Sequence, residues 1–148
     1  MRALTLHQPW GWAIAAGHKA VENRPWEPPR GFIGERFAIH AGKTYDFEGG
    51  RKIAQLLGLD VLPPEVNIAG AVIAVATCVR VIQDRTLDPE RSTKNLSNEE
   101  FRWFFGPFGW VLRDVVRLER PVPCRGFQQL WTLPPDVEAE VIAQLEGK

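Results

Sequence analysis

The sequence predicts a mixed α+β fold in which short strands form a small β-barrel surrounded by short helices. Three observations predict this fold. Segments with the apolar pattern of strands outnumber helical ones, and proline pairs at residues 28–29, 63–64 and 134–135 separate them. The connections are also short, which favours a mixed barrel over a parallel α/β sheet. A length of 148 residues fits one domain, spanning 1–148, with one core.

Six segments have the composition of strands and end near proline, glycine or polar residues. They cover residues 3–6, 20–24, 35–41, 68–79, 110–118 and 128–133. The run at 68–79 lacks a clean alternation, so we expect a long, central strand that is covered on both faces. It is shorter than the about 20 residues that span a bilayer, and no signal peptide is visible. We therefore expect a cytoplasmic protein with no membrane partner.

Four segments have helical signals. Pro9 suits the first position of a helix and Gly17 suits its end, because proline there loses no needed donor and glycine tolerates a left-handed cap. Ser97-x-x-Glu100 has the pattern of a capping box that opens a short helix through residue 105. Residues 47–57 are expected to be helical despite Gly49-Gly50, and residues 84–96 to form a loop. The helix after Pro134-Pro135 should place four apolar residues on one side: Val137, Val141, Ile142 and Leu145.

The charge distribution confines any anion site to the first third of the chain. Lys and Arg together number 18, as do Asp and Glu, so the net charge is zero and general binding of long polyanions is not expected. Residues 1–52 hold eight basic and five acidic residues, residues 53–133 hold nine of each, and residues 134–148 hold one and four. The N-terminal excess is small and supports only a local site.

Several functional classes lack the motifs they need. Cys78 and Cys124 form no CxxC pair, so we expect two reduced thiols rather than a disulfide framework. His7, His18 and His40 lack the spacing of metal ligands, so no metal site is expected. There is no Gly-x-x-x-x-Gly-Lys loop and no Gly-x-Gly-x-x-Gly loop, so no nucleotide cofactor is indicated.

The segment Gly17-x-Lys19-x-x-Glu22-x-Arg24 carries the most chemistry. Side chains alternate along a strand, so Glu22 and Arg24 share a face, with Lys19 just before the strand. An ammonium or guanidinium suits phosphate, and a carboxylate can accept from the exocyclic amine of a base. The plain alternative is an ordinary ion pair on a strand face. Composition alone favours that alternative, because exposed ion pairs are common and weakly stabilising.

The ordered set of motifs resembles the ASCH domain family over nearly the whole chain. The opening matches at Leu6-His7-Gln8-Pro9-Trp10, Ala13-Ile14, Gly17, Lys19, Glu22, Asn23 and Arg24. Later matches are Ile39-His40-Ala41, Gly70, Gly106-Pro107-Phe108-Gly109-Trp110 before Val111-Leu112, and residues 126–131. The resemblance implies a PUA-like β-barrel with a cleft lined by the Lys-Glu-Arg signature, and binding of RNA or a nucleotide.

One bacterial branch of this family, which resembles the chain more distantly, hydrolyses acetylated cytidine. That branch has lysine and threonine three residues apart and a glutamate from a later strand. Here Lys19 matches the lysine, but Glu22 stands at the threonine position, so the hydroxyl nucleophile is missing. The resemblance therefore does not extend to this amidohydrolase activity.

The aromatic residues predict where bases could stack. Six tryptophans accompany one tyrosine, and an exposed tryptophan can stack a base for about 1–3 kcal/mol. We expect Trp103 and Trp131 in the core, where large aromatic side chains dominate packing. Trp10, Trp26 and Trp110 flank the signature or its matching loop, so we expect them at the rim of the cleft.

Three functions remain open from the sequence. The leading hypothesis is a module that binds RNA, single-stranded nucleic acid or a free nucleotide. The second is a hydrolase of RNA or a modified nucleoside that uses Lys19 and Glu22 with His40, although a strand-end histidine is more often a hydrogen-bonded wall residue. The third is a protein-interaction adaptor with a tryptophan-rich surface and an acidic terminal helix. The expected ligand-binding residues are Gln8, Trp10, Lys19, Glu22, Arg24, Trp26, His40 and Trp110.

Overall fold

The computed structural model describes residues 1–147, and its centre is a six-stranded mixed sheet with the strand order β2-β5-β4-β3-β1-β6. The strands are β1 (Arg2–Gln8), β2 (Val21–Arg24), β3 (Arg36–Tyr45), β4 (Ala71–Gln83), β5 (Phe108–Pro123) and β6 (Leu130–Thr132). β1 and β3 are parallel and the other neighbours are antiparallel. The expected mixed α+β class is confirmed.

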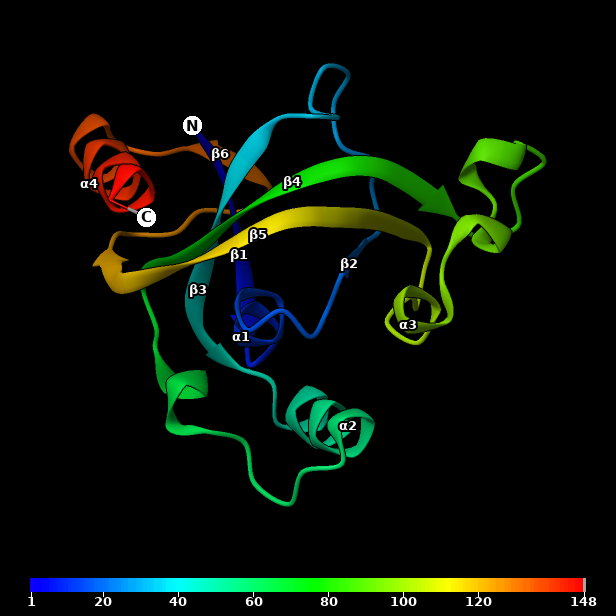
Figure 1. Ribbon diagram of the computed structural model, residues 1–148, viewed down its shortest axis with the longest axis horizontal. Helices are drawn as coiled ribbons and strands as arrows, with labels where there is room; N and C mark the ends of the chain where they lie inside the picture. Colours follow the sequence, from blue (N-terminus) through cyan, green and yellow to red (C-terminus); the bar gives the residue numbers. More distant parts are fainter. Residues whose placement is uncertain (148) are drawn as a thin grey trace.

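The sheet curls as expected of a small barrel but does not close. β2 and β6 are the two edge strands, and the pairings among residues 1–147 do not join them. The two longest strands, β4 and β5, arch together over the other strands (Figure 1). Residues 71–76 of β4 are all buried, which confirms a central strand covered on both faces. β5 runs longer than expected because its pairing with β4 continues to Pro123.

Four α-helices surround the sheet: α1 (Trp10–Ala15), α2 (Phe47–Leu57), α3 (Asn98–Phe101) and α4 (Pro135–Glu146). The bounds of α2 are those expected, and the Ser97–Glu100 capping box that opens α3 is present. Helix α1 begins at Trp10, so Pro9 is its cap residue and not its first helical residue. The expected loop at residues 84–96 contains two short 3₁₀ turns, Pro89–Arg91 and Thr93–Asn95.

The core has three parts. The first lies inside the curl of the sheet and includes Leu4, Ile39 and Trp110. The second packs α4 on the sheet, and the third packs α1 and α2 beside β2 and β5. Trp103 is fully buried and Trp131 is 8% exposed, which confirms both as core residues.

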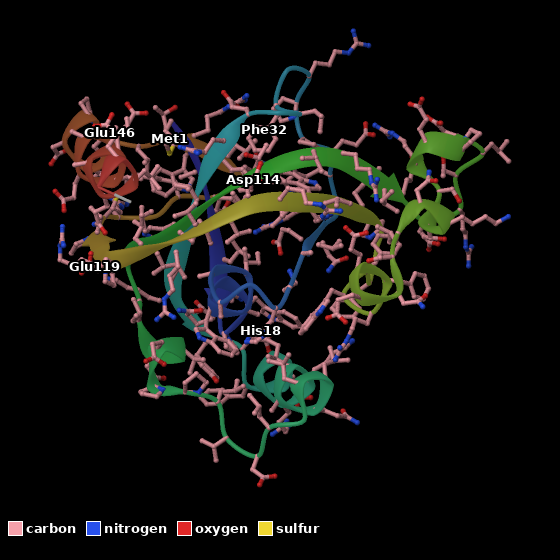
Figure 2. The ribbon with its side chains drawn as sticks, viewed as in Figure 1. Met1, His18, Phe32, Asp114, Glu119 and Glu146 are labelled. Atoms are coloured by element: carbon pink, nitrogen blue, oxygen red, sulfur yellow. The ribbon has the colours of Figure 1, made fainter. Side chains whose placement is uncertain are left out.

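Helix α4 fixes the C-terminal end of the chain beside the N-terminus (Figures 1 and 2). The Met1 ammonium forms an ion pair with Glu138, and Gln144 exchanges two hydrogen bonds with the backbone of Arg120. Val137 and Val141 are buried as expected, but Ile142 is 38% exposed and does not share their side. Nowhere in residues 1–147 does a helix have the length and apolar character needed to cross a membrane.

Candidate nucleic-acid-binding cleft

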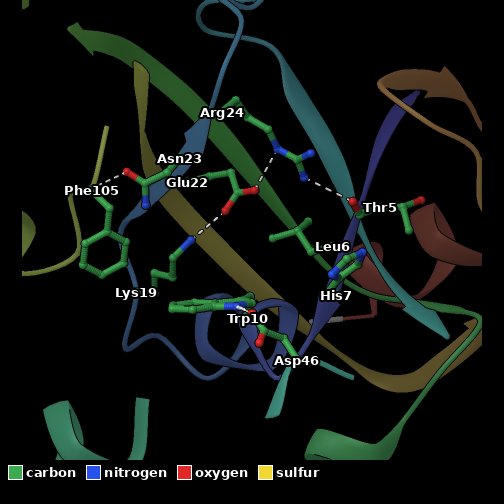
Figure 3. A pocket seen from close by; sticks show the side chains of 10 residues that line it. All are labelled: Thr5, Leu6, His7, Trp10, Lys19, Glu22, Asn23, Arg24, Asp46 and Phe105. Carbon is green, nitrogen blue, oxygen red and sulfur yellow. Dashed lines mark hydrogen bonds and ion pairs between the residues drawn. The ribbon is translucent and has the colours of Figure 1, made fainter. Parts of the chain in front are cut away.

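A cleft of about 310 Å³ opens between β1 and β2 (Figure 3). These two strands are not neighbours in the sheet, so the cleft lies on the side where the sheet stays open. Its volume is at the lower end of the range for small-molecule sites. The lining residues are Thr5, Leu6, His7, Trp10, Lys19, Glu22, Asn23, Arg24, Asp46 and Phe105.

Glu22 joins two basic side chains at the floor of the cleft. Its Oε1 accepts a hydrogen bond from Lys19 Nζ at 2.6 Å, and its Oε2 accepts one from Arg24 Nε at 2.9 Å. The side chains of Lys19 and Glu22 are 2% and 8% exposed, and that of Arg24 is 21% exposed. Glu22 and Arg24 do form the ion pair of the plain alternative, but it is not an isolated exposed pair, because Glu22 is buried and also binds the buried Lys19.

Local chain geometry brings these groups together. Gly17 ends the first helical segment with φ of +83°, a left-handed conformation that glycine adopts without strain. The turn that follows is held by Lys19 N, which donates to Ala13 O at 3.0 Å and fixes the start of the Lys19 side chain. Strand alternation then turns Glu22 and Arg24 to the same side, as the sequence predicts.

Burial sets the protonation balance of this cluster. Desolvation lowers the pKa of Lys19 from its ordinary 10.5, because a buried ammonium loses its hydration. Glu22 opposes this shift through its charge and its hydrogen bond, while the nearby Arg24 guanidinium adds to the lowering. A lysine ammonium has three donors, and in residues 1–147 only Glu22 accepts from this one. Lys19 can therefore donate to an acceptor in the cleft.

Trp10 forms one wall of the cleft, and its ring is held from two sides. Its Nε1 donates to Asp46 Oδ2 at 2.9 Å, and Lys19 Nζ lies 5.4 Å from the centre of the ring. Asp46 also caps α2 through Gly49 N. The hydrogen bond from Trp10, followed by that from Gly49, lowers the pKa of the Asp46 carboxyl from its ordinary value. The indole plane is therefore fixed before any ligand arrives.

Phe105 completes the rim from a distant part of the chain. Asn23 Oδ1 accepts from Phe105 N at 2.7 Å and from Gly106 N at 3.2 Å, and Asn23 Nδ2 donates to Trp103 O at 2.9 Å. The Phe105 ring packs edge-on against Trp10, with 6.0 Å between ring centres, and the residue remains 43% exposed. Asn23 thus ties the loop after α3 to β2 and holds an aromatic ring at the mouth of the cleft.

Two of the tryptophans expected at the rim lie elsewhere. Trp110 pairs with Glu22 of β2, but its ring is fully buried because it packs against Phe32 in the core inside the curl of the sheet. Trp26 packs edge-on against Trp110 at 5.0 Å between ring centres and does not line the cleft. Of the six tryptophans, four are buried and two, Trp10 and Trp26, are half-buried.

Gln8 and His40 are also outside the cleft. Gln8 is buried and joins two segments: its Oε1 accepts from Trp12 N, and its Nε2 donates to Ile68 O, both at 2.9 Å. His40 is 1% exposed, lies 3.1 Å from Thr5 Oγ1 through Nδ1, and contacts Cys124 O through Nε2 at 2.7 Å. It is a wall residue, so the hydrolase alternative loses the histidine that it required.

Sequence reasoning missed six residues of the lining. The position of Asp46 could have been predicted, because aspartate directly before a helical segment is a preferred N-cap residue. Asn23 stands inside the recognised signature. Phe105 has no local signal, since the contact that places it spans more than 80 residues of chain. The others are Thr5, Leu6 and His7, which follow from β1 forming the second wall.

Metal binding has no support in this part of the molecule. Within the described residues, no three His, Cys, Asp or Glu side chains are grouped as they would be around a metal ion.

Thr5 carries the hydroxyl among the lining residues, but its side chain points away from Glu22 (Figure 3). That hydroxyl contacts His40 and accepts from Trp131 Nε1 at 3.0 Å. The lining of the cleft therefore offers cations, carboxylates and aromatic rings, and its one hydroxyl is already hydrogen-bonded elsewhere.

The chain matches the family model of the ASCH domain over residues 4–116. Its structure is similar to that of an ASCH protein from Zymomonas mobilis, with a TM-score of 0.54 and 19% sequence identity over 96% of this chain and 93% of the other. Two mutant forms of a Zymomonas mobilis ASCH protein give TM-scores of 0.53 and 0.54 at 19% and 20% identity. They cover 96% of this chain and 96% and 94% of theirs. At such identities the likeness shows the fold alone. No curated protein sequence matches the chain.

Proposed function

Because the chain belongs to the ASCH domain family, which is generally RNA-binding, we propose that the cleft between β1 and β2 binds a nucleotide unit of single-stranded RNA. The observation that carries this proposal is the Lys19–Glu22–Arg24 cluster, which sits under an open cleft beside two fixed aromatic rings.

Each part of the cleft suits one part of a nucleotide. The base stacks beside Trp10, a contact that every base can make through its π-face. Glu22 accepts from an exocyclic amine on the base edge, since a carboxylate oxygen has room for a second donor. Lys19 and Arg24 donate to ligand oxygens: Lys19 has uncommitted donors, and Arg24 is the more exposed of the two cations.

Because Lys19 and Glu22 are buried, a small number of polar contacts can contribute substantially to the binding free energy. The net charge of the chain is zero, so long-range attraction of RNA is weak. At the floor of the cleft, however, water is largely excluded around Lys19 and Glu22, and polar contacts there are stronger than on the surface. Binding is expected to be local and selective for the ligand's shape, with a small salt dependence.

A titration of short single-stranded RNAs at two salt concentrations tests the proposal. Arg24→Gln should weaken binding for all sequences and reduce the slope of log affinity against log salt by about 0.7. Glu22→Gln should change the preference among bases more than the overall affinity, because it keeps the shape but gains a donor.

Arg120→Gln is the matched control. It removes the same charge from an exposed arginine on β5, which lies beside α4 and not in the cleft. Thermal melts must show that each variant is folded at the titration temperature. If folded Arg24→Gln and Glu22→Gln bind RNA like the unaltered protein, the cleft is not the binding site and the proposal is wrong.

A further inference from the structure

A second hollow continues the cleft along the first turns of α2. It is lined by Trp10, Asp46, Glu48, Gly49, Arg51, Lys52 and Gln55. Trp10 and Asp46 line both hollows, so the two meet at the Trp10 ring. A ligand that extends past the Trp10 wall of the cleft therefore reaches the hollow along α2.

Lys52 stands at this junction with its charge uncommitted. Its Nζ lies 3.8 Å from the centre of the Phe105 ring, and among residues 1–147 it forms no ion pair. The other charges of the hollow are engaged: Asp46 accepts from Trp10 and Gly49, and Glu48 is paired with Arg51. The ammonium of Lys52 is thus the cation of this hollow that remains available to an anion.

We propose that Lys52 binds the phosphate next to the nucleotide held in the cleft, so that the ligand is a single-stranded oligonucleotide and not a free nucleotide. This inference rests on the proposed function of the cleft. The geometry favours it because aromatic rings for the bases and a neighbouring cation for the backbone are the combination by which proteins bind a single strand, and Lys52 lies over the Phe105 ring beside the Trp10 wall. Phe105 holds the ammonium at the border between the two hollows.

The test compares ligands that differ only in length. Calorimetric titrations use the ribonucleoside 5′-monophosphates of adenine, cytosine and uracil and the matching RNA hexamers. For the unaltered protein, the better hexamers should bind at least tenfold more tightly than their monophosphates. Lys52→Gln should lose most of that gain, keep its affinity for the monophosphates within twofold, and lower the salt slope for hexamers by about 0.7.

Lys94→Gln serves as the control, because Lys94 is an exposed lysine in the loop at residues 84–96, away from α2 (Figure 1). It should leave both affinities unchanged. If monophosphates bind but hexamers bind no better, or if Lys52→Gln behaves like Lys94→Gln, the second subsite is wrong while the cleft stands. If neither ligand binds the unaltered protein, the proposed function itself has failed, and this inference with it.

Discussion

Arg24 joins two strands that do not pair with each other: its Nη2 donates to the carbonyl oxygen of Thr5 on β1 at 3.1 Å, while its own strand is β2 at the far edge of the sheet. Its Nε donates at the same time to Glu22. A side chain thus spans the gap that backbone hydrogen bonds would fill in a closed barrel. Here β1 and β2 are linked by the Arg24 guanidinium, which also binds the Glu22 carboxylate, and not by backbone hydrogen bonds. The space between the two strands therefore stays open as the cleft, with polar atoms facing it.

Glu22→Gln should destabilise the folded protein by about 3 kcal/mol, because it leaves the buried Lys19 ammonium without a counter-charge. Burial already lowers the pKa of Lys19, and the carboxylate is what opposes that shift. Urea unfolding measures the loss. The double variant Lys19→Met with Glu22→Gln should recover most of the stability, since it removes the unpaired charge. A double variant as unstable as Glu22→Gln alone would contradict this account of the pair.

Gly49→Ala should disturb Trp10 although alanine favours helices. An added Cβ would lie 2.4 Å from Trp10 Nε1 and 2.6 Å from Asp46 Oδ2, so the indole and its hydrogen bond must move. We expect a loss of about 1–3 kcal/mol relative to Gly50→Ala, together with weaker RNA binding. Gly50 is the matched control, because a Cβ there lies no closer than 3.1 Å to another atom, Tyr45 Oη. Equal stability and affinity in the two variants would show that Trp10 is not held in this way.

His40 should make the protein less stable in mild acid. A carbonyl can only accept, so His40 Nε2 carries the proton towards Cys124 O, and Nδ1 accepts from the Thr5 hydroxyl. Burial lowers the pKa of His40 below its ordinary 6.5, so the unfolded chain binds a proton there before the folded one does. The contribution of neutral His40 to the free energy of unfolding should therefore be complete above pH 6.5. It should decrease as the pH falls from 6.5 towards the pKa that His40 has in the folded protein.

Urea unfolding at pH 5.5 and 7.5 checks this expectation. His40→Gln should show a smaller difference between the two pH values than the unaltered protein, whereas His18→Gln, at an exposed histidine, should not. The same pH dependence in His40→Gln and the unaltered protein would assign the effect to carboxyl groups instead.

The purified protein should not deacetylate acetylated cytidine. Glu22 occupies the position of the hydroxyl in the amidohydrolase branch, and the Thr5 hydroxyl is committed to His40 and Trp131 on the other side of β1. No group at the cleft floor can accept the acyl group as a hydroxyl nucleophile would. Chromatography of the nucleoside after incubation measures turnover. Steady release of cytidine that Lys19→Ala abolishes would show that the substitution of Glu22 has been misread.

The sequence predicts which residues of the Lys-Glu-Arg signature lie on one side of the chain. It does not predict how deeply the residues around them are buried, or which residues from distant parts of the chain complete the cleft. Alternation along a strand places Glu22 and Arg24 on one side, and the Gly17 stop sets Lys19 before them. The same alternation cannot tell the open end of the curl from its packed interior, which is why Trp110 was expected at the rim although it is fully buried. Phe105 depends on a contact with Asn23 across the fold, which no local pattern reports.

Photo-crosslinking tests the central claim most directly. Short single-stranded RNA that carries 4-thiouridine is irradiated with the protein, and the crosslinked tryptic peptides are sequenced by mass spectrometry. We predict adducts in the peptides of residues 3–19 and 103–113, at Trp10 and Phe105, the two rings beside the cleft. The adducts should disappear when unlabelled RNA competes. Adducts confined to residues 126–147, on α4 and the chain before it, would place RNA on another face and contradict the assignment of the cleft.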